Sequence, residues 1–223
     1  MGEGLTVSDW YPVLLKVEGR KCVVFGGGFV AQRKTEGLLQ ARADVRLISP
    51  RLTPELRAWA EAGRLLWTER EAEEKDLDGA MLAFAATDDP DANRSLADAA
   101  RIRGIPINIA NAGEAGEFIL PAVLRRGGLV LTASASGAGP ALAARIIDEL
   151  AERYGPEYNE NIEALRTIRG IVKSEVANPS ERRALLQAAV TDEALEEWRS
   201  SPRLQDNAEL LARLRQRAID RKG

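Results

Sequence analysis

A short apolar run that ends in three consecutive glycines constrains the fold of this chain more than any other feature. Residues Cys22 to Phe25 are all apolar, and Gly26, Gly27 and Gly28 follow them directly. A β-rich apolar run closed by glycines is typical of a parallel strand that is buried on both faces. Because a helical pattern begins at residue 30, the sequence predicts a strand, a tight turn and a helix, which is the first unit of an α/β sheet.

The same alternation continues as far as residue 110. Further strands are expected at residues 43–48, 65–67, 79–86 and 105–110, and helices at 30–40, 54–63 and 91–103. Strands that alternate with helices in this way predict a doubly wound, Rossmann-type parallel sheet. In the first helix we expect Val30, Leu38 and Leu39 to face inward. The lead-in from Tyr11 to Val17 could form an extended edge segment.

A different pattern starts after residue 113. Two strands are expected at 118–124 and 129–134, joined by a hairpin turn at Gly127 and Gly128. A helix is expected at 141–153, and further helices at 157–176, 180–189, 191–199 and 205–221. The inward face of the first of these should carry Leu142, Ile146, Ile147 and Leu150. The sequence thus predicts a Rossmann domain at 1–113, a dimerisation segment at 114–150 and an all-helical domain at 151–223.

Composition excludes several classes of protein. Hydrophobic residues make up 45% of the chain, which is enough for a core, and the net charge is only −3. Without a long basic block, nothing indicates a nucleic-acid or anionic-membrane partner, and no apolar run is long enough to cross a bilayer. The absence of histidine excludes a His-based triad and a Cys/His zinc site. The lone Cys22 fits a reducing cytoplasm, and we expect no metal site.

The glycine turn is the strongest candidate binding motif. Gly26, Gly28 and Ala31 have the G-x-G-x-x-A spacing that lets a pyrophosphate approach the backbone at a helix start. A glycine turn without a ligand is the competing interpretation. No acidic residue follows the second strand, where Pro50 and Arg51 stand instead. This leaves a phosphate-bearing NADP open, with Arg51 or Arg46 as its partner.

Three further stretches place polar residues at expected ligand-binding positions. Thr87 follows a buried strand and is a candidate for the cofactor, whereas Asp89 or Asp91 is expected to cap the next helix. The stretch from Asn108 to Phe118 follows another strand, although its composition alone favours a turn. The loop from Ser134 to Pro140 enters a helix, where amides and hydroxyls suit carboxylates, although on the residues alone a flexible loop with a capping serine is favoured.

Together these stretches resemble the precorrin-2 dehydrogenases, which include stand-alone enzymes and the N-terminal module of siroheme synthases. The matches cover residues 11–150 in order. They are Tyr11-Pro12, Val24-x-Gly26-Gly27-Gly28-x-Val30-Ala31-x-Arg33-Lys34, Ala85-Ala86-Thr87-Asp88-Asp89 with Asn93, Asn108-Ile109 with Phe118 and Pro121, and Ser134-x-Ser136-Gly137-x-Gly139-Pro140. The helical tail matches only in general character.

The resemblance implies an NAD-dependent enzyme that removes two hydrogens from precorrin-2 to give sirohydrochlorin. Some members also insert ferrous iron to give siroheme. The resemblance further implies a homodimer built largely by the middle segment, with a helical tail over the tetrapyrrole. The residues expected at NAD are Gly26, Gly28, Phe29, Val30, Pro50, Arg51 and Thr87. Those expected at precorrin-2 are Asn111, Ser134, Ser136 and Gly137.

The resemblance fails at the position that carries a catalytic aspartate in relatives, which here is Asn111. An amide cannot act as a base. An engineered or inactive variant, a natural member that loses the proton to solvent or another residue, and a shifted loop all remain open. Glu114 and Glu117 are nearby carboxylates. A protein that binds NAD(H) without chemistry, as a sensor or impaired homologue, is the rival class, and turnover distinguishes it from the enzyme. A protein that acts only as a metal chelatase is disfavoured, because metal ions bind best to anionic or imidazole ligands and this chain has no histidine and an amide at Asn111.

Overall fold

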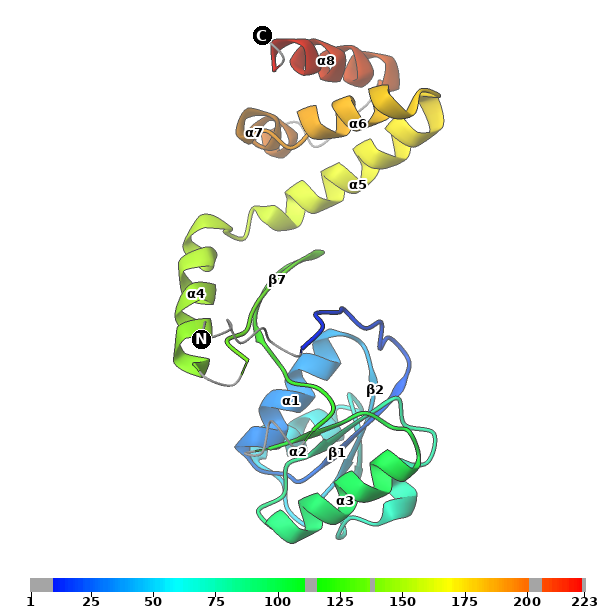
Figure 1. Cartoon of the computed structure of the whole chain (residues 1–223), viewed down its shortest axis with the longest axis vertical. Helices are drawn as coiled ribbons and strands as arrows, with labels where there is room; N and C mark the ends of the chain where they lie inside the picture. The colour runs from blue at the N-terminus through cyan, green and yellow to red at the C-terminus, as the bar shows by residue number, and fades with distance from the viewer. Residues whose placement is uncertain (1–9, 111–115, 137–138, 201–205, 222–223) are drawn as a thin grey trace, which may run out of the picture. The chain divides into compact units, whose positions relative to one another are not determined.

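The computed structural model describes residues 10–110, 116–136, 139–200 and 206–221 of the chain (Figure 1). The chain divides into two compact units, one that ends at Leu120 and one that begins at Pro121. The expected boundary at 113 lies outside the described residues. The hairpin and the helix that follows it belong to the same unit as the C-terminal helices, so their separation at residue 150 stays a prediction.

The first unit is built on the predicted parallel sheet. Its five strands lie in the order β3-β2-β1-β4-β5, and every pairing is parallel. The elements of this unit are β1 (Lys21–Phe25), α1 (Phe29–Gln40), β2 (Asp44–Ile48), α2 (Pro54–Glu61), β3 (Leu66–Thr68), the 3-10 helix η1 (Glu74–Leu77), β4 (Leu82–Ala85), α3 (Pro90–Ile102) and β5 (Ile107–Ile109). The predicted Rossmann-type alternation is confirmed.

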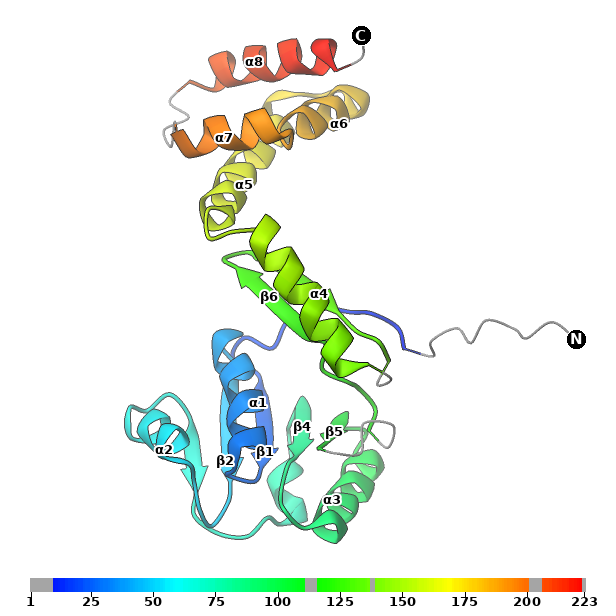
Figure 2. The same cartoon turned by 90° about the vertical axis from the view of Figure 1, so that its left-hand side faces the viewer.

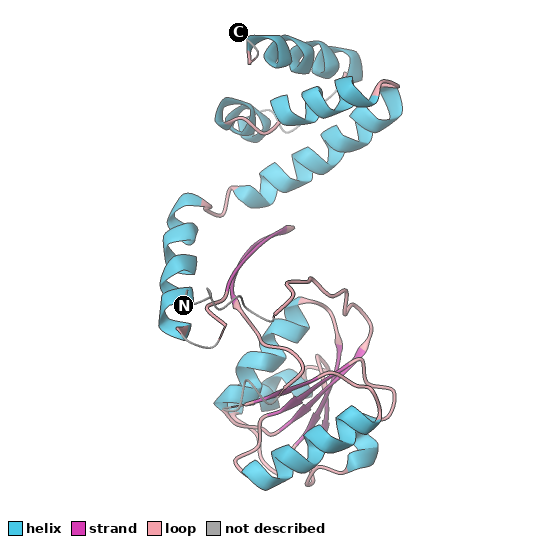
Figure 3. Ribbon diagram, in the orientation of Figure 1, coloured by secondary structure: helices cyan, strands magenta, loops and turns pink. Residues whose placement is uncertain are grey.

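Helices cover both faces of this sheet (Figures 2 and 3). On one face, Val24 and Phe84 pack against α1 and α2 in a cluster that includes Leu56 and Trp59. On the other, Phe25 lies in a second cluster with residues of α3 and with Leu77 of η1. Burial on both sides explains the uninterrupted apolar runs of β1 and β4, since a central parallel strand has no solvated face.

Two expectations about the first unit were wrong. The lead-in before β1 forms no strand, and Tyr11 is 86% exposed. In α1 the inward positions include Lys34 and Thr35, whereas Val30 is 36% exposed. Leu38 is buried as expected and Leu39 packs against the core, so the apolar residues identified part of the inward face but missed the lysine and threonine on it.

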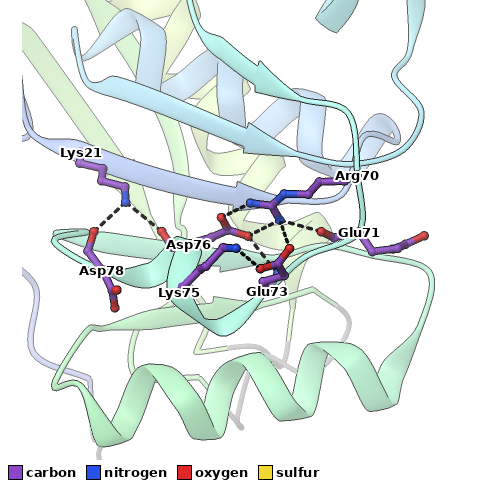
Figure 4. A network of polar contacts seen from close by, with 7 residues as sticks. All are labelled: Lys21, Arg70, Glu71, Glu73, Lys75, Asp76 and Asp78. Carbon is purple, nitrogen blue, oxygen red and sulfur yellow. Dashed lines mark hydrogen bonds and ion pairs between the residues drawn. The ribbon is translucent and has the colours of Figure 1, made fainter.

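A polar network fastens the connection between β3 and β4 (Figure 4). The Arg70 guanidinium donates to both carboxylate oxygens of Asp76, at 2.8 and 2.6 Å. Lys21 of β1 donates to the backbone oxygens of Asp76 and Asp78 at 2.9 and 2.7 Å. The short 3-10 helix is thereby attached to the central strand of the sheet by side chains as well as by Leu77.

The second unit begins with an antiparallel hairpin. It pairs β6 (Ala122–Arg126) with β7 (Leu129–Ala133), and Gly127 has a positive φ of 55° in the turn, as predicted. The first strand begins at Ala122 rather than at the expected residue 118. Residues before Pro121 are instead attached to β5 of the first unit, where Glu117 donates its backbone N–H to the oxygen of Ile107 at 3.0 Å.

The rest of the second unit is helical, as expected. Its helices are α4 (Pro140–Arg153), α5 (Tyr158–Glu175), α6 (Pro179–Ala188), α7 (Asp192–Ser200) and α8 (Asn207–Asp220). The last four enclose a core that includes Ile168, Leu185, Trp198 and Leu214. The face of α4 that was expected to be inward is only partly buried. Ile147 is buried, whereas Leu142 and Ile146 are 46% and 37% exposed.

Candidate functional site

The carboxyl ends of β1 and β4 mark the point where the sheet can form a ligand crevice. These strands are neighbours, with Phe25 opposite Ala85 in the register. The chain leaves β1 toward β2 on one side, whereas β4 leads to β5 on the other. Open α/β sheets bind ligands at such a topological switch point, because the two connections diverge there and leave a crevice. The glycine turn and Thr87 follow these two strand ends.

At two of the three glycine positions, the neighbouring backbone leaves no room for a side chain. Gly26 has a φ of +109°, and a Cβ there would lie 2.2 Å from the backbone oxygen of Ala86. A Cβ on Gly27 would lie 1.9 Å from the backbone oxygen of Arg51. Because moving either neighbouring backbone segment would cost free energy, any side chain at Gly26 or Gly27 would push the turn away from its neighbours.

Gly28 differs from the other two because it faces open space. A Cβ there would meet nothing within 4 Å, and its φ of −84° is accessible to any residue. It is the N-cap of α1, and no side chain accepts a hydrogen bond from the first amides of that helix. Uncapped amides at a helix start attract anions. Phe29, the first residue of α1, is 80% exposed beside them.

Thr87 lies half-buried on the β4 side of the crevice and is held by Asn93 of α3. Its hydroxyl lies 2.8 Å from the amide oxygen of Asn93, which also accepts the Thr87 backbone N–H at 3.1 Å. The Asn93 side-chain amide donates to the Thr87 backbone oxygen at 3.0 Å. Asp89 caps α3 by accepting from the amides of Asp91 and Ala92, so the expected capping role falls to Asp89.

The structure distinguishes the two arginines, Arg46 and Arg51, that the sequence offered as partners for the extra phosphate of NADP. Arg46 lies within β2, and its guanidinium is 2.7 Å from the carboxylate of Asp44. Arg51 and Pro50 are both exposed just beyond the carboxyl end of that strand. The turn is fixed by Ser49, whose hydroxyl donates to the Arg51 backbone oxygen at 2.7 Å. Of the two, only Arg51 therefore follows the strand on the crevice side.

A buried lysine lies on the inward face of α1, and motif reasoning gave it no role. Lys34 of α1 is 9% exposed and donates to the side-chain oxygen of Asn108 at 2.5 Å. Its ammonium lies 5.7 Å from the centre of the Phe84 ring. Burial lowers the pKa of Lys34 to about 8, and the positive charge of Arg33 acts in the same direction. The available signal was the position of Lys34 on the inward helix face, three residues after Ala31.

The expected tetrapyrrole residues are only partly described. Asn111 and Gly137 lie outside the described residues, as does Glu114. Ser134 accepts the backbone N–H of Ser136 at 3.2 Å, which is a local turn, and Ser136 has a φ of +50°. Neither serine caps α4, whose N-cap is Gly139 without a side-chain bond.

The carboxylate of Glu117 is already engaged. One oxygen accepts the backbone N–H of Ile107 at 3.0 Å, and the other accepts from Arg101 at 2.9 Å. The Glu117 carboxylate therefore accepts a hydrogen bond at the edge of β5, where a further strand would otherwise pair.

The described part of the chain has neither a cluster of metal-ligating side chains nor a membrane-spanning helix. Within it, no three His, Cys, Asp or Glu side chains are grouped so that they could hold a metal ion. None of the helices in those same ranges combines the length and the apolar character that a membrane crossing needs.

The sequence is similar to known proteins in the region that builds this crevice. Residues 13–122 match a family model described as "Putative NAD(P)-binding". The siroheme synthases of Shigella sonnei and Shigella flexneri are each 33% identical over 187 residues, which are 84% of this chain and 41% of theirs. The chain thus spans less than half the length of these relatives.

A solved structure is similar over nearly the whole chain. It is that of SirC, a precorrin-2 dehydrogenase, with a TM-score of 0.71 and 26% identity, covering 93% of this chain and 100% of SirC. The likeness includes the helical part, which the motifs did not reach. The Rossmann-type first unit thus matches an NAD(P)-binding family model, and the chain with its helical second unit is similar in sequence to the siroheme synthases and in structure to SirC.

Proposed function

We propose that this chain oxidises precorrin-2 to sirohydrochlorin, with NAD as the hydride acceptor. The observation that carries the proposal is the open, uncapped helix start at Gly28, which lies at the switch point of the sheet. The likeness to SirC over its full length supports the choice of substrate. Precorrin-2 loses two hydrogens in this reaction, one as a hydride to the nicotinamide and the other as a proton to a base or to solvent.

The residues at the crevice fit a dinucleotide. The backbone N–H groups from Gly28 to Val30 would receive the pyrophosphate, because no side chain competes for the N-terminal end of α1. Pro50 and Arg51 would lie along the adenosine, and Thr87 would border the other half of the cofactor. When bound, NAD supplies the hydride acceptor, and the protein supplies orientation and a path for the proton.

We further propose that the cofactor is NAD rather than NADP. Arg51 is exposed and would attract the extra phosphate of NADP. The protein should therefore bind NADP with a measurable affinity as well. Arg51→Ala should weaken NADP binding by about tenfold or more while NAD affinity changes by less than about threefold. Calorimetry with both cofactors measures this. Tighter NADP than NAD binding by the unmodified protein would overturn the assignment of NAD.

The proton acceptor is the point at which this chain departs from the resemblance. Asn111 stands where the expected aspartate would be, and the carboxylate of Glu117 is engaged at β5. This favours solvent or a group of the substrate as the acceptor. It also favours, as a second candidate, a sensor or impaired homologue that binds NAD(H) without turnover. NADH formed in equal amount to sirohydrochlorin supports the enzyme, and NAD binding with no product supports the sensor.

We also propose a homodimer whose interface includes the β6–β7 hairpin and α4. Val123, Leu142 and Ile146 are 40%, 46% and 37% exposed within the second unit. Apolar side chains grouped on neighbouring elements favour a protein partner, and a second copy covers the same residues on both subunits. The cytoplasmic location indicated by the lone cysteine, and an additional ferrochelatase activity, stay predictions.

A further inference from the structure

Gln32 is a polar residue of α1 whose side-chain amide is held at its oxygen but not at its nitrogen. The oxygen accepts the hydroxyl of Thr53 at 2.7 Å. Because an amide carries its acceptor and its donors on opposite sides, this bond turns the nitrogen away from Thr53. Within the described residues that nitrogen has no acceptor, and the side chain is half-buried. Gln32 therefore holds two N–H donors in a fixed direction that no described residue uses.

The Gln32 amide lies at the end of α1 where the helix begins. Helix side chains tilt toward the N-terminus, so that of Gln32, which is four residues after Gly28, reaches back over the first turn. The contact with Thr53 agrees with this direction. Thr53 is the N-cap of α2, and its backbone N–H donates to the oxygen of Gly27 at 2.9 Å. The amide is thus placed between the glycine turn and the start of α2.

The surroundings of this amide suit a phosphate group. The first turn of α1 contains no acidic residue, and no side chain caps its amides. A helix start of this kind carries a partial positive charge, which attracts anions. The Gln32 donors lie beside these free amides, and phosphate oxygens can accept hydrogen bonds from both.

We propose that Gln32 is a further cofactor-binding residue, whose side-chain amide donates to the pyrophosphate beside the backbone amides of α1. This rests on the proposed function, which places the dinucleotide at Gly28. Thr53 is a positioning residue in this proposal, because its hydroxyl fixes the Gln32 oxygen and so directs the nitrogen toward the ligand. Gln32 acts on the affinity for the cofactor and has no part in hydride transfer.

Gln32→Glu separates the donor from the rest of the side chain. The carboxylate keeps the length and still accepts from Thr53, but it cannot donate, and its charge repels a phosphate. We expect the Kd for NAD, and for ADP as a probe that also carries two linked phosphates, to rise at least about tenfold. The melting temperature without ligand should be kept or raised, because a carboxylate near a helix start is favourable. Gln40→Glu, the same change at the last residue of α1, is the control and should leave both affinities unchanged.

Gln32→Met removes the donor without adding a charge. It should weaken NAD and ADP by about three- to tenfold, which is less than Gln32→Glu. The additional loss in Gln32→Glu should shrink at high salt, because salt screens the repulsion between carboxylate and phosphate. In both variants the KM for NAD should rise while kcat at saturating NAD stays within about twofold, as expected for an interaction made equally before and during the reaction.

Failure of this proposal and failure of the proposed function give different results. If the unmodified protein binds NAD and both Gln32 variants bind NAD and ADP within about twofold of it, only the role of Gln32 is overturned. Weaker binding in Gln32→Glu alone also overturns it, because the added charge then explains the loss. So does weaker binding that follows a fall in melting temperature.

The outcome for the unmodified protein decides the proposed function separately. If it binds NAD but forms no sirohydrochlorin, the oxidation fails, whereas the loss of affinity in the Gln32 variants would still support the role of Gln32. If it binds neither NAD nor ADP, both proposals are overturned.

Discussion

At the scale of single residues, the three glycines after β1 have different reasons to be glycine. Gly26 and Gly27 lie against the backbone oxygens of Ala86 and Arg51, so the turn itself excludes a side chain. Gly28 has room for one and an ordinary φ. The sequence pattern treats the three alike, and only the neighbouring backbones distinguish a packing requirement from an open approach for a ligand.

The first prediction uses this difference. Gly28→Val should weaken NAD binding by about tenfold or more, or about 1.4 kcal/mol, because a branched side chain would stand where the pyrophosphate approaches. The melting temperature should barely change, since nothing lies within 4 Å of the added Cβ. Gly27→Ala should instead lower stability by about 1–3 kcal/mol through overpacking. Unchanged NAD affinity in Gly28→Val, measured by calorimetry, would remove the assigned site.

A second prediction at this scale concerns Asn111. Asn111→Asp should restore a base and raise the rate of precorrin-2 oxidation by roughly 10- to 10⁴-fold, the range for one acid–base group. Binding of precorrin-2 should change much less, because the shape of the side chain is kept. Single-turnover kinetics at matched pH compare the two proteins. Equal rates would mean that this position is not catalytic here, and a slower aspartate variant would mean that the site is built around the amide.

At the scale of elements, most of the first unit could be predicted from the sequence. The strands were recognisable because burial on both faces produces uninterrupted apolar runs such as Val23 to Phe25. The start of β6 was not, because the stretch from Phe118 to Leu124 is apolar throughout and the attachment of Glu117 to β5 is a long-range contact. Lys34 was missed as an inward position for a related reason, since periodicity counts apolar residues and cannot see its bond to Asn108.

The connection between β3 and β4 gives a prediction about pH. The hydrogen bonds from Arg70 hold the pKa of Asp76 below its usual value, so protonation is resisted in the folded state. A depressed carboxyl pKa contributes stability above the unfolded value of about 3.9 and loses it as pH falls through the folded value. Asp76→Asn should therefore be less stable than the unmodified protein at pH 7, by on the order of 1 kcal/mol, because Arg70 is partly solvated.

Denaturant unfolding across pH checks this expectation. The difference in unfolding free energy between the two proteins should be constant above about pH 5 and should shrink below about pH 4. Asp91→Asn is the matched control, since Asp91 forms an ion pair with Arg94 in which both side chains are more than 70% exposed. A difference that stays constant down to the lowest accessible pH would mean that the Asp76 carboxylate contributes nothing through its charge.

At the scale of the whole molecule, the chain is two units of different character. The first carries the proposed cofactor crevice, and the second combines a hairpin with helices that enclose their own core. The motifs covered residues 11–150 and did not reach the last four helices, whereas the likeness to SirC extends over 93% of the chain. The second unit was predictable as helical but not as a family feature, because amphipathic periodicity alone is common to many helical domains.

The proposed dimer gives a prediction at this scale. The unmodified protein should sediment as a dimer at micromolar concentration, and Ile146→Glu should shift it to a monomer, because each subunit would bury a carboxylate in an apolar interface. Ile219→Glu is the control, since Ile219 is a more exposed apolar residue on α8, away from the hairpin and α4. A monomeric unmodified protein would contradict the dimer, and an unchanged Ile146→Glu dimer would move its interface elsewhere.

In the proposed reaction, NAD bound at the Gly28 end of α1 oxidises precorrin-2. Anaerobic incubation of the unmodified protein with both compounds tests it most directly, with sirohydrochlorin and NADH followed by their absorbance. The two products should form in equal amounts, and Gly28→Val at the same NAD concentration should be slower by about the factor lost in NAD affinity. Full binding of NAD with neither product formed would mean that this chain is not a precorrin-2 dehydrogenase and would favour the sensor.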